Sequence, residues 1–385
     1  MVLKTNQVDK SYALFKTESG FLKLEKPVQY FQVTNKSITN VLTNEVQKFD
    51  TQAFDELFNK KWQVQILEYE LGHLFQWDDL LTQEEVNLAT FINFESTSEL
   101  TTIEDDALSG ARITCESFRD EYRNKFKATY ENLLDGNCYQ LNLTRIIPLE
   151  VNDISLLEKS FRYESIFSSL GEFAHLINLP LQDRLILSNS PECLFEYDFI
   201  EKKIVTRPIK GTIKKELGRD SLIGDVKNES ELNIITDLLR HDLSGIGENF
   251  SVVESLREFF EVPGLIHQYS RISVKEDHLN IPKVLKAIFP GGSITGAPKK
   301  RVLKLIKEIE AQKRGLYTGS TVLAVDKIAK ASINIRSLDV IKSTCAARYG
   351  SGGGITLLSE EVSEFDELLE KTNSFLKVFF KDVNF

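Results

Sequence analysis

The sequence is poor in cysteine and methionine and has no excess of basic side chains. Its four cysteines include no C-x-x-C pair, so neither a zinc site nor a disulfide framework is indicated; they are Cys115, Cys138, Cys193 and Cys345. The formal net charge is −10, and no basic stripe offers the phosphate contacts on which nucleic-acid binding rests. We therefore expect small molecules or proteins as partners, and no nucleic acid.

Long hydrophobic runs are also missing. None approaches the length of a membrane span, and the first residues, MVLKTNQVDKSYALFK, lack the apolar core of a signal peptide. We expect no membrane partner, and the scattered cysteines favour a cytoplasmic protein. The 385 residues, 42% of them hydrophobic, provide enough material for a large core in one big domain or two ordinary ones.

Short aromatic strands dominate the first part of the chain. GFLKLEKPVQYFQVT and WQVQILEYELG alternate apolar and polar residues and predict strands. The acidic and polar residues 95–107 predict a loop or linker. We place a lobe boundary there, between residues 1–108 and residues 109–385.

Longer helices and more strands are predicted in the rest of the chain. The helices cover residues 116–135, 153–170, 229–243, 299–313 and 359–377. The strands are CYQLNLTRI, RLILS, CLFEYDF, KKIVTRPIKG, YTGSTVLAV and ASINIRSLDV. Because the strand clusters are interrupted by helices without a regular βαβ alternation, we predict an α+β fold with largely antiparallel sheets.

Three glutamates stand out on two of the predicted helices. Glu231 lies on the same helix face as apolar residues four and seven positions later, so it is either buried with a partner or solvated near the helix N-terminus. In the last helix Glu364 and Glu367 share a face, and Lys371 follows one turn later. The glutamates form either a solvated flank or a set of oxygen ligands for a hard ion such as Mg²⁺.

Glycine is concentrated in two loops. FPGGSITGAPKKRV precedes a predicted helix, and YGSGGGITLLS precedes the last one. Such loops expose backbone N–H groups that bind carboxylates or phosphates, although tight packing alone also selects glycine. Neither loop has the G-K-[ST] ending of a nucleotide-binding P-loop.

Lys210 lies in the compact segment TRPIKGT, between Pro208 and Gly211. Proline fixes one backbone angle, and glycine permits the close approach of a ligand or another strand. The segment is therefore either a solvated strand end or a rigid support for the lysine amine.

An ordered set of motifs resembles the chorismate-utilising enzymes, in the branch that contains aminodeoxychorismate synthase component I and anthranilate synthase component I. The motifs lie within residues 136–375 and are YQLNLTR, SPE, PIKGT, LLRHDL, PGGSITGAPK, INIRSL, GSGGGI and the E-x-x-E-x-x-x-K of the last helix. The resemblance implies two packed antiparallel β-sheets flanked by helices. Residues 109–385 would be the chorismate-binding catalytic region, and residues 1–108 would add strands to the same sandwich. The LLES signature of tryptophan-binding relatives is not found.

Two positions indicate the branch. Isochorismate and salicylate synthases share a lysine that activates water, and this chain has Gln140 at the corresponding position. The segment PIKGT resembles that of aminodeoxychorismate synthases, whereas anthranilate synthases have PIAGT. The resemblance thus implies amination of chorismate to 4-amino-4-deoxychorismate, on the route to 4-aminobenzoate and folate. The alternatives are an anthranilate synthase and a catalytically silent chorismate-binding subunit.

The resemblance also implies catalytic and metal-binding roles. The Lys210 amine would attack C2 of chorismate while Glu192, in SPE, protonates the departing C4 hydroxyl; ammonia would then attack C4 and expel the lysine. Mg²⁺ would be held directly by Glu231 and Glu367 and through water by Glu364. At the position three before Glu231, where relatives carry an acid, this chain has Asn228.

The remaining predicted site residues would bind the substrate. Arg336, which we place on a strand alternating with Ile333 and Ile335, would hold the enolpyruvyl carboxylate together with Tyr317. The other predicted substrate-binding residues are Gly211, Thr212, Gly352, Gly353, Gly354, Lys371 and His267. For His267 the alternative is a purely structural role. Because no glutaminase motif is found, a separate glutamine amidotransferase subunit would supply the ammonia.

Overall fold

The computed structural model describes residues 10–77, 84–115, 117–221, 223–246, 250–262 and 265–384. Its named strands form one continuous hydrogen-bonded sheet. In this sheet β21 and β7 pair parallel, and the other strand pairs are antiparallel. Two long strands, β2 (Phe21–Thr34) and β6 (Asn87–Leu100), pair along their length and join the two halves of the sheet. The α+β class predicted from the sequence is confirmed.

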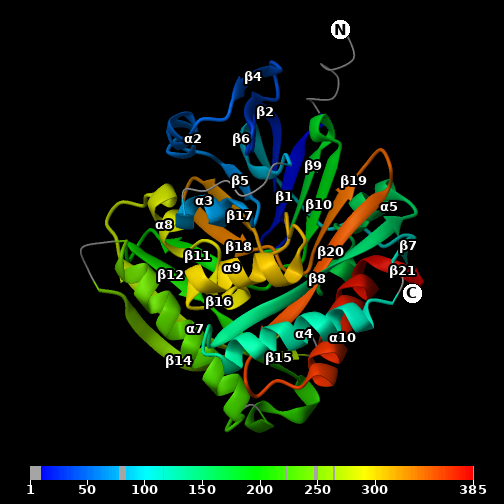
Figure 1. Cartoon of the computed structure of the whole chain (residues 1–385). Coiled ribbons are helices and arrows are strands. Elements are labelled where there is room, and N and C mark those ends of the chain that lie inside the picture. The colour runs from blue at the N-terminus through cyan, green and yellow to red at the C-terminus, as the bar shows by residue number, and fades with distance from the viewer. Residues whose placement is uncertain are drawn as a thin grey trace.

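The two halves of the sheet form two layers, which lie on the right and the left of Figure 1. The first runs β21 (Phe380–Asn384), β7 (Ser109–Ile113), β8 (Gln140–Val151), β20 (Ala346–Ile355), β19 (Ser337–Ile341), β10 (Arg184–Ser188), β9 (His175–Leu179) and β1 (Tyr12–Lys16). The second runs from β6 through β5 (Val64–Leu67), β17 (Ser320–Val325), β18 (Ile328–Ile333), β11 (Cys193–Asp198), β12 (Lys203–Arg207) and β15 (Leu265–Lys275). β13 (Ile209–Lys214) and β14 (Val252–Val262) both pair with β15, while β3 (Ser37–Asn40) and β4 (Glu45–Lys48) extend from β2.

One hydrophobic core lies between the layers. Ile177 of β9 and Ile186 of β10 pack in the same cluster as Ile66 of β5 and Leu323 of β17. Successive strand residues point to opposite faces, so each layer also presents a second apolar face outward. Helices must cover those faces.

Helices cover the outer face of each layer. The first layer packs against α4 (Arg119–Leu134), α5 (Ile154–Ser160), α6 (Glu164–Phe167), α9 (Lys299–Glu310) and α10 (Glu361–Phe379). The second packs against α2 (Thr51–Phe58), α3 (Leu71–Trp77), α7 (Val226–Ser244) and α8 (Ile281–Ile288). Short 3₁₀ turns are η1 (Pro180–Gln182), η2 (Lys215–Leu217), η3 (Arg219–Ser221) and η4 (Gly292–Ile294), and β16 (Gly296–Ala297) pairs with β8. Within the described residues no helix has the length and apolar character needed to cross a membrane.

Strands from the first hundred residues lie inside both layers. β1 pairs with β9, and β5 pairs with β17. The N-terminal strands therefore share their backbone hydrogen bonds with strands from the rest of the chain.

Two predicted elements were wrong in the N-terminal half. The predicted loop 95–107 begins as strand, because β6 runs to Leu100 and its polar end pairs with β2, as Ser96 does with Glu25. The predicted helix 153–170 is broken between α5 and α6, where Phe161 and Tyr163 are buried in the core. Packing of these aromatic rings overrides the continuous helical pattern.

The predicted strand ASINIRSLDV was also wrong, since it is two strands, β18 and β19. Arg336 lies at the break between them with a left-handed φ of 50°. It therefore does not alternate with Ile333 and Ile335 along a strand.

The N-terminus of α7 is capped by its own sequence. Asp225 accepts a hydrogen bond from the backbone N–H of Asn228 at 3.0 Å, and the Asn228 side chain donates to the same carboxylate at 2.9 Å. Replacing Asp225 by alanine should lower the free energy of unfolding by about 1 kcal/mol, because a backbone donor loses its partner. Urea unfolding measures this, and Asp237→Ala on the exposed face of α7 is the matched control. Equal stability of the two variants would contradict the capping role.

Candidate active site

Lys210 and Glu231 meet at the interface between β13 and α7. The Lys210 Nζ lies 3.5 Å from the Glu231 Oε2, and the two side chains are only 13% and 7% exposed. Pro208 separates β12 from β13, and the pairing of β13 with β15 shifts register between Ile209 and Thr212. This irregularity lies at the lysine, while α7 packs on β13. The sequence left two alternatives for Glu231, burial with a partner or solvation near the helix N-terminus. In the structure Glu231 is buried and has a cationic partner.

Glu192 is buried in the segment between β10 and β11. Burial raises the pKa of this carboxyl group, and this effect exceeds the lowering by the Ser293 hydrogen bond and by the Lys210 and Lys371 amines. Its Oε1 has no hydrogen-bond partner among the described residues. The site therefore favours a neutral carboxylic acid, which is able to give up a proton.

α10 brings its charged residues to the glycines of β20. The Lys371 Nζ lies 2.7 Å from the Glu367 Oε1 and donates to the Gly352 carbonyl at 3.1 Å. Glu364 is buried, and a Cβ on Gly353 would lie 3.3 Å from its Oε2. A side chain at Gly353 would therefore crowd the Glu364 carboxylate, whereas Glu367 is half exposed.

Tyr317 and Arg336 lie near Glu192 on another side of the site. Burial raises the pKa of the Tyr317 phenol, and the Glu310 and Glu192 carboxylates add to the effect against the opposing Arg314 cation. Burial lowers the pKa of Arg336, against the opposing effect of Tyr349 and Glu192. No carboxylate of the described residues forms an ion pair with Arg336. Its cation is therefore suited to an anionic ligand.

His267 lies on β15 opposite Thr212 of β13. Burial and the nearby Arg336 cation lower the pKa of His267 to about 4, so the imidazole is neutral at physiological pH. Gly211, beside Lys210, has a φ of 90° that favours glycine.

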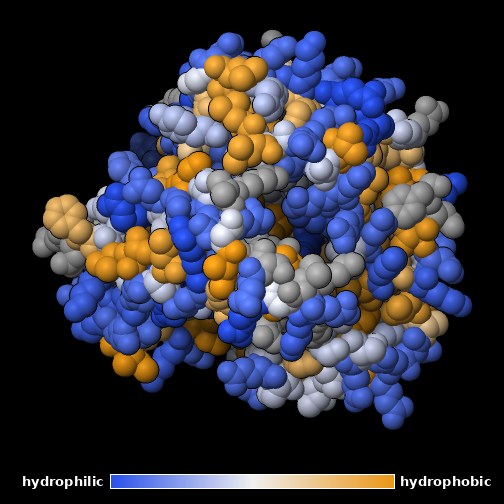
Figure 2. All heavy atoms as spheres, turned by 90° about the horizontal axis from the view of Figure 1, so that it is seen from below, coloured by the Kyte–Doolittle hydropathy of each residue, from blue (hydrophilic) through white to orange (hydrophobic). Residues whose placement is uncertain are grey.

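The predicted site residues thus form one connected group. Glu192 interacts electrostatically with Lys210, Lys371, Tyr317 and Arg336, and Lys210 contacts Glu231. The end of the molecule that carries α7 and α10 is hollowed, and the walls of the hollow are mostly hydrophilic (Figure 2). Across the described parts of the chain, no three carboxylate, imidazole or thiol groups converge in the manner of a complete metal site.

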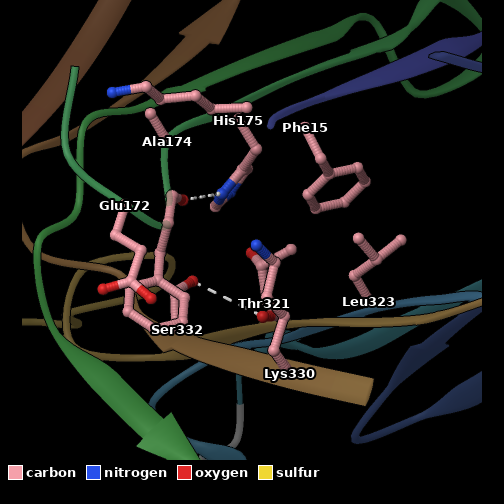
Figure 3. Close-up of a pocket in the computed structure, with 10 residues that line it drawn as sticks. Phe15, Glu172, Ala174, His175, Thr321, Leu323, Lys330 and Ser332 are labelled. Atoms are coloured by element: carbon pink, nitrogen blue, oxygen red, sulfur yellow. Dashed lines mark hydrogen bonds between the residues drawn. The ribbon is translucent and has the colours of Figure 1, made fainter. Parts of the chain in front are cut away.

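A second pocket lies between β1, β9, β17 and β18 and contains none of the predicted site residues (Figure 3). Phe15, His175 and Leu323 line it. Burial lowers the pKa of His175 to about 4. The neutral ring can therefore donate from Nδ1 to the Phe173 carbonyl at 3.0 Å. This pocket is separate from the Lys210 group.

Sequence reasoning missed two supporting residues. Ser293, in the first glycine-rich loop, lies close enough to Glu192 to lower the pKa of its carboxyl group. Arg314 is fully buried, pairs with Glu310 at 2.7 Å and donates to the Ile294 and Asn142 carbonyls. The i, i+4 spacing of Glu310 and Arg314 was a visible signal, but nothing in the sequence showed which backbone they would hold.

Gly350 on β20 is packed directly against Tyr317. A Cβ at Gly350 would lie 2.0 Å from the Tyr317 Cγ, so the ring would have to move. We expect Gly350→Ala to lower the free energy of unfolding by roughly 1–3 kcal/mol through overpacking. Gly245→Ala is the control, because its added Cβ would meet only a carbonyl oxygen at 3.6 Å. Equal melting temperatures of the Gly350→Ala and Gly245→Ala variants would contradict this packing.

Comparison with known proteins identifies the family. Residues 98–377 match the family model described as chorismate binding enzyme. The chain belongs to the chorismate binding enzymes. This membership accords with the glycine-rich loops and ordered motifs that surround Lys210.

Curated relatives in this chorismate binding family are similar over about two thirds of the chain. The aminodeoxychorismate synthase component 1 of Escherichia coli (strain K12) is 34% identical over 276 residues, which cover 67% of this chain and 57% of the relative. An uncharacterized PabA-like protein of Haemophilus influenzae is 32% identical over 266 residues, covering 65% of this chain and 74% of the relative. The chain thus matches little more than half the length of the E. coli relative.

A solved structure shows the same chorismate binding fold. The anthranilate synthase component I from Streptococcus pneumoniae TIGR4 aligns with a TM-score of 0.72 at 17% identity, covering 95% of this chain and 92% of that chain. At this identity the likeness is one of fold.

Proposed function

We propose that this chain converts chorismate and ammonia to 4-amino-4-deoxychorismate, as an aminodeoxychorismate synthase component I. The observation that carries the proposal is the Lys210 amine, which is largely buried, lies 3.5 Å from the Glu231 carboxylate and interacts with Glu192. The relatives that bear this name support it, as does the PIKGT segment.

Lys210 acts as the nucleophile in the proposed reaction. The neutral amine attacks C2 of chorismate, the ring double bonds shift and the C4–O bond breaks. Glu192 gives its proton to the departing hydroxyl, which leaves as water. Ammonia then attacks C4, the C2–N bond to Lys210 breaks, and the lysine is regenerated. Two displacements retain the configuration at C4.

Substrate anions are bound by the cationic side of the site. Arg336 and Tyr317 bind the enolpyruvyl carboxylate, since the Arg336 cation has no protein carboxylate paired with it among the described residues. Lys371, His267 and the backbone of Gly211, Thr212, Gly352, Gly353 and Gly354 line the remainder of the site.

The acidic residues fit Mg²⁺ by the chemistry of their donors. Glu231 and Glu364 are buried carboxylates from two different helices, and hard divalent ions take oxygen ligands. We propose that Glu231 and Glu367, the latter ion-paired with Lys371, would hold the ion directly, and that Glu364 would hold it through water. When bound, Mg²⁺ would neutralise the ring carboxylate of chorismate.

A separate glutamine amidotransferase subunit supplies the ammonia in this proposal. The component 1 designation of the relatives supports a second component. Purified chain is expected to use ammonium directly, and to use glutamine only after the amidotransferase is added.

Product analysis tests the proposed function. The chain is incubated with chorismate, Mg²⁺ and ammonium, and the products are separated by chromatography. We expect 4-amino-4-deoxychorismate. Fluorescent anthranilate would show instead the chemistry of an anthranilate synthase, and chorismate binding without any product would show a silent subunit.

A further inference from the structure

Two charged residues of the motifs LLRHDL and PGGSITGAPK form a buried ion pair. The Lys299 Nζ lies 2.5 Å from the Asp242 Oδ2, and the two side chains are 7% and 12% exposed. The same amine donates to the carbonyl of Ile288, the last residue of α8, at 3.1 Å. Lys299 thus joins three helices, because Asp242 lies in the last turn of α7 and Lys299 begins α9. The proposed reaction uses neither residue.

Neither charge is placed where its own helix favours it. The helix dipole disfavours an anion in the last turn, where Asp242 lies, and a cation in the first turn, where Lys299 lies. Taking both groups out of water also costs free energy, so an apolar pair of similar size often gives equal or greater stability. The ion pair is therefore better explained by what it positions than by the stability that it adds.

The face of α7 that carries Asp242 also carries Glu231. The two residues are eleven positions apart, which is close to three helical turns, and Leu238 lies between them on the same face. A Cβ on Gly292 would lie 2.6 Å from the Leu238 Cδ2, so η4 packs directly on α7. One face of α7 thus contacts Lys210 at one end and the first glycine-rich loop at the other.

The same glycine-rich loop packs against the segment that contains Glu192. A Cβ on Gly291 would lie 2.8 Å from the Ile333 Cδ1 and 3.5 Å from the Leu194 Cδ1. Ile333 donates its backbone N–H to the Glu192 carbonyl at 3.0 Å. Ser293 is buried and lies close enough to Glu192 to lower the pKa of its carboxyl group. The loop is therefore packed between α7 and the acid of the proposed reaction.

We propose that the ion pair of Asp242 and Lys299 positions Glu192 for proton donation to the C4 oxygen of chorismate. This inference rests on the proposed function. The ion pair holds the glycine-rich loop against α7, and the loop fixes the carboxylic acid relative to Glu231 and the Lys210 amine beside it. Asp242 and Lys299 are positioning residues, since both act through the loop.

Steady-state kinetics of a Lys299→Met protein test this role. Methionine keeps most of the aliphatic stem and removes the charge, so the loop loses its link to Asp242. We expect kcat for chorismate amination to fall about tenfold, with the KM for chorismate changed less than about twofold, because Glu192 acts on the C4–O bond and not in binding. Lys203→Met is the matched control and should retain kcat, since Lys203 is 12% exposed and lies 2.7 Å from Glu254 on the other side of its strand pair, away from the loop.

A double-mutant cycle with Glu192→Gln shows whether the loss passes through the acid. The Glu192→Gln protein has no carboxylic acid to position, so adding Lys299→Met to it should lower kcat less than about twofold. A fall by the same factor in both backgrounds would overturn the proposal, because the ion pair would then act independently of Glu192.

The Asp242→Leu/Lys299→Met protein separates positioning from stability. Lys299→Met alone leaves a buried carboxylate without its cation and should lower the melting temperature, whereas the double substitution removes that charge and should raise the melting temperature again. We expect kcat to stay as low as in the single variant. A kcat that recovers together with the melting temperature would overturn the proposal. The double variant also carries the test if Lys299→Met does not fold, which circular dichroism would show.

Failure of this inference differs from failure of the proposed function. A folded Lys299→Met protein with the kcat of the wild type overturns the positioning role and leaves the proposed amination intact. If the wild-type chain makes no 4-amino-4-deoxychorismate from chorismate, Mg²⁺ and ammonium, the proposed function fails, and the inference fails with it.

Discussion

Replacing Lys210 by alanine is expected to lower kcat for chorismate amination by roughly three orders of magnitude or more, because the covalent route is lost with its nucleophile. Chorismate binding should be weakened far less, since Arg336 and Tyr317 remain. Initial rates with saturating ammonium measure the first effect, and calorimetric titration with chorismate measures the second.

Lys203 provides a matched control for this variant. Its side chain is 12% exposed, close to the 13% of Lys210, and it is also ion-paired with a glutamate, but it lies on β12 away from the predicted site residues. Lys203→Ala should retain kcat. A Lys210→Ala protein that still aminates chorismate at the rate of the Lys203→Ala protein would exclude lysine as the nucleophile.

Replacing Glu192 by glutamine is expected to lower kcat by about 10²- to 10⁴-fold, the usual contribution of a general acid. Burial raises the pKa of Glu192, and the acid is active in its protonated form. The wild-type rate should therefore fall as pH rises through this raised pKa. The variant should lack that alkaline decrease, because glutamine does not titrate.

The same Glu192→Gln variant should be more stable than the wild type at neutral pH. A carboxyl group whose folded-state pKa is raised stabilises the fold below its unfolded pKa, and this contribution is lost as pH rises through the folded value. Glutamine carries no such charge cost. Thermal unfolding at pH 7 and at a pH below the ordinary range of glutamate measures the difference, which should disappear at the acidic pH. A variant that is both active and less stable at neutral pH would refute the role of Glu192.

Much of the fold was predictable because local patterns and tertiary packing agree. The helical spacing around Glu231 put it on an apolar face, and the structure buries it in α7. The predicted strands RLILS and CLFEYDF correspond to β10 and β11. In these segments the face on which the sequence places apolar residues is also the face that packs into the core.

Other features depend on partners distant in sequence. The polar end of β6 is held by backbone pairing with β2, which residue polarity does not reveal. The bend at Arg336 is a left-handed residue between β18 and β19, in a segment whose alternation predicts one strand. The proximity of Gln140 and Asn142 to Gly354 arises only when β8 pairs with β20. Sequence motifs predicted the members of the candidate site, while the pairing of strands sets which atoms face one another.

Intact-protein mass spectrometry after addition of chorismate and Mg²⁺ without ammonium tests the central claim most directly. The account predicts a covalent adduct equal in mass to chorismate less one water, located by peptide mapping at Lys210 and absent from the Lys210→Ala protein. An unmodified lysine in a preparation that aminates chorismate once ammonium is added, or an adduct that persists in Lys210→Ala, would contradict it.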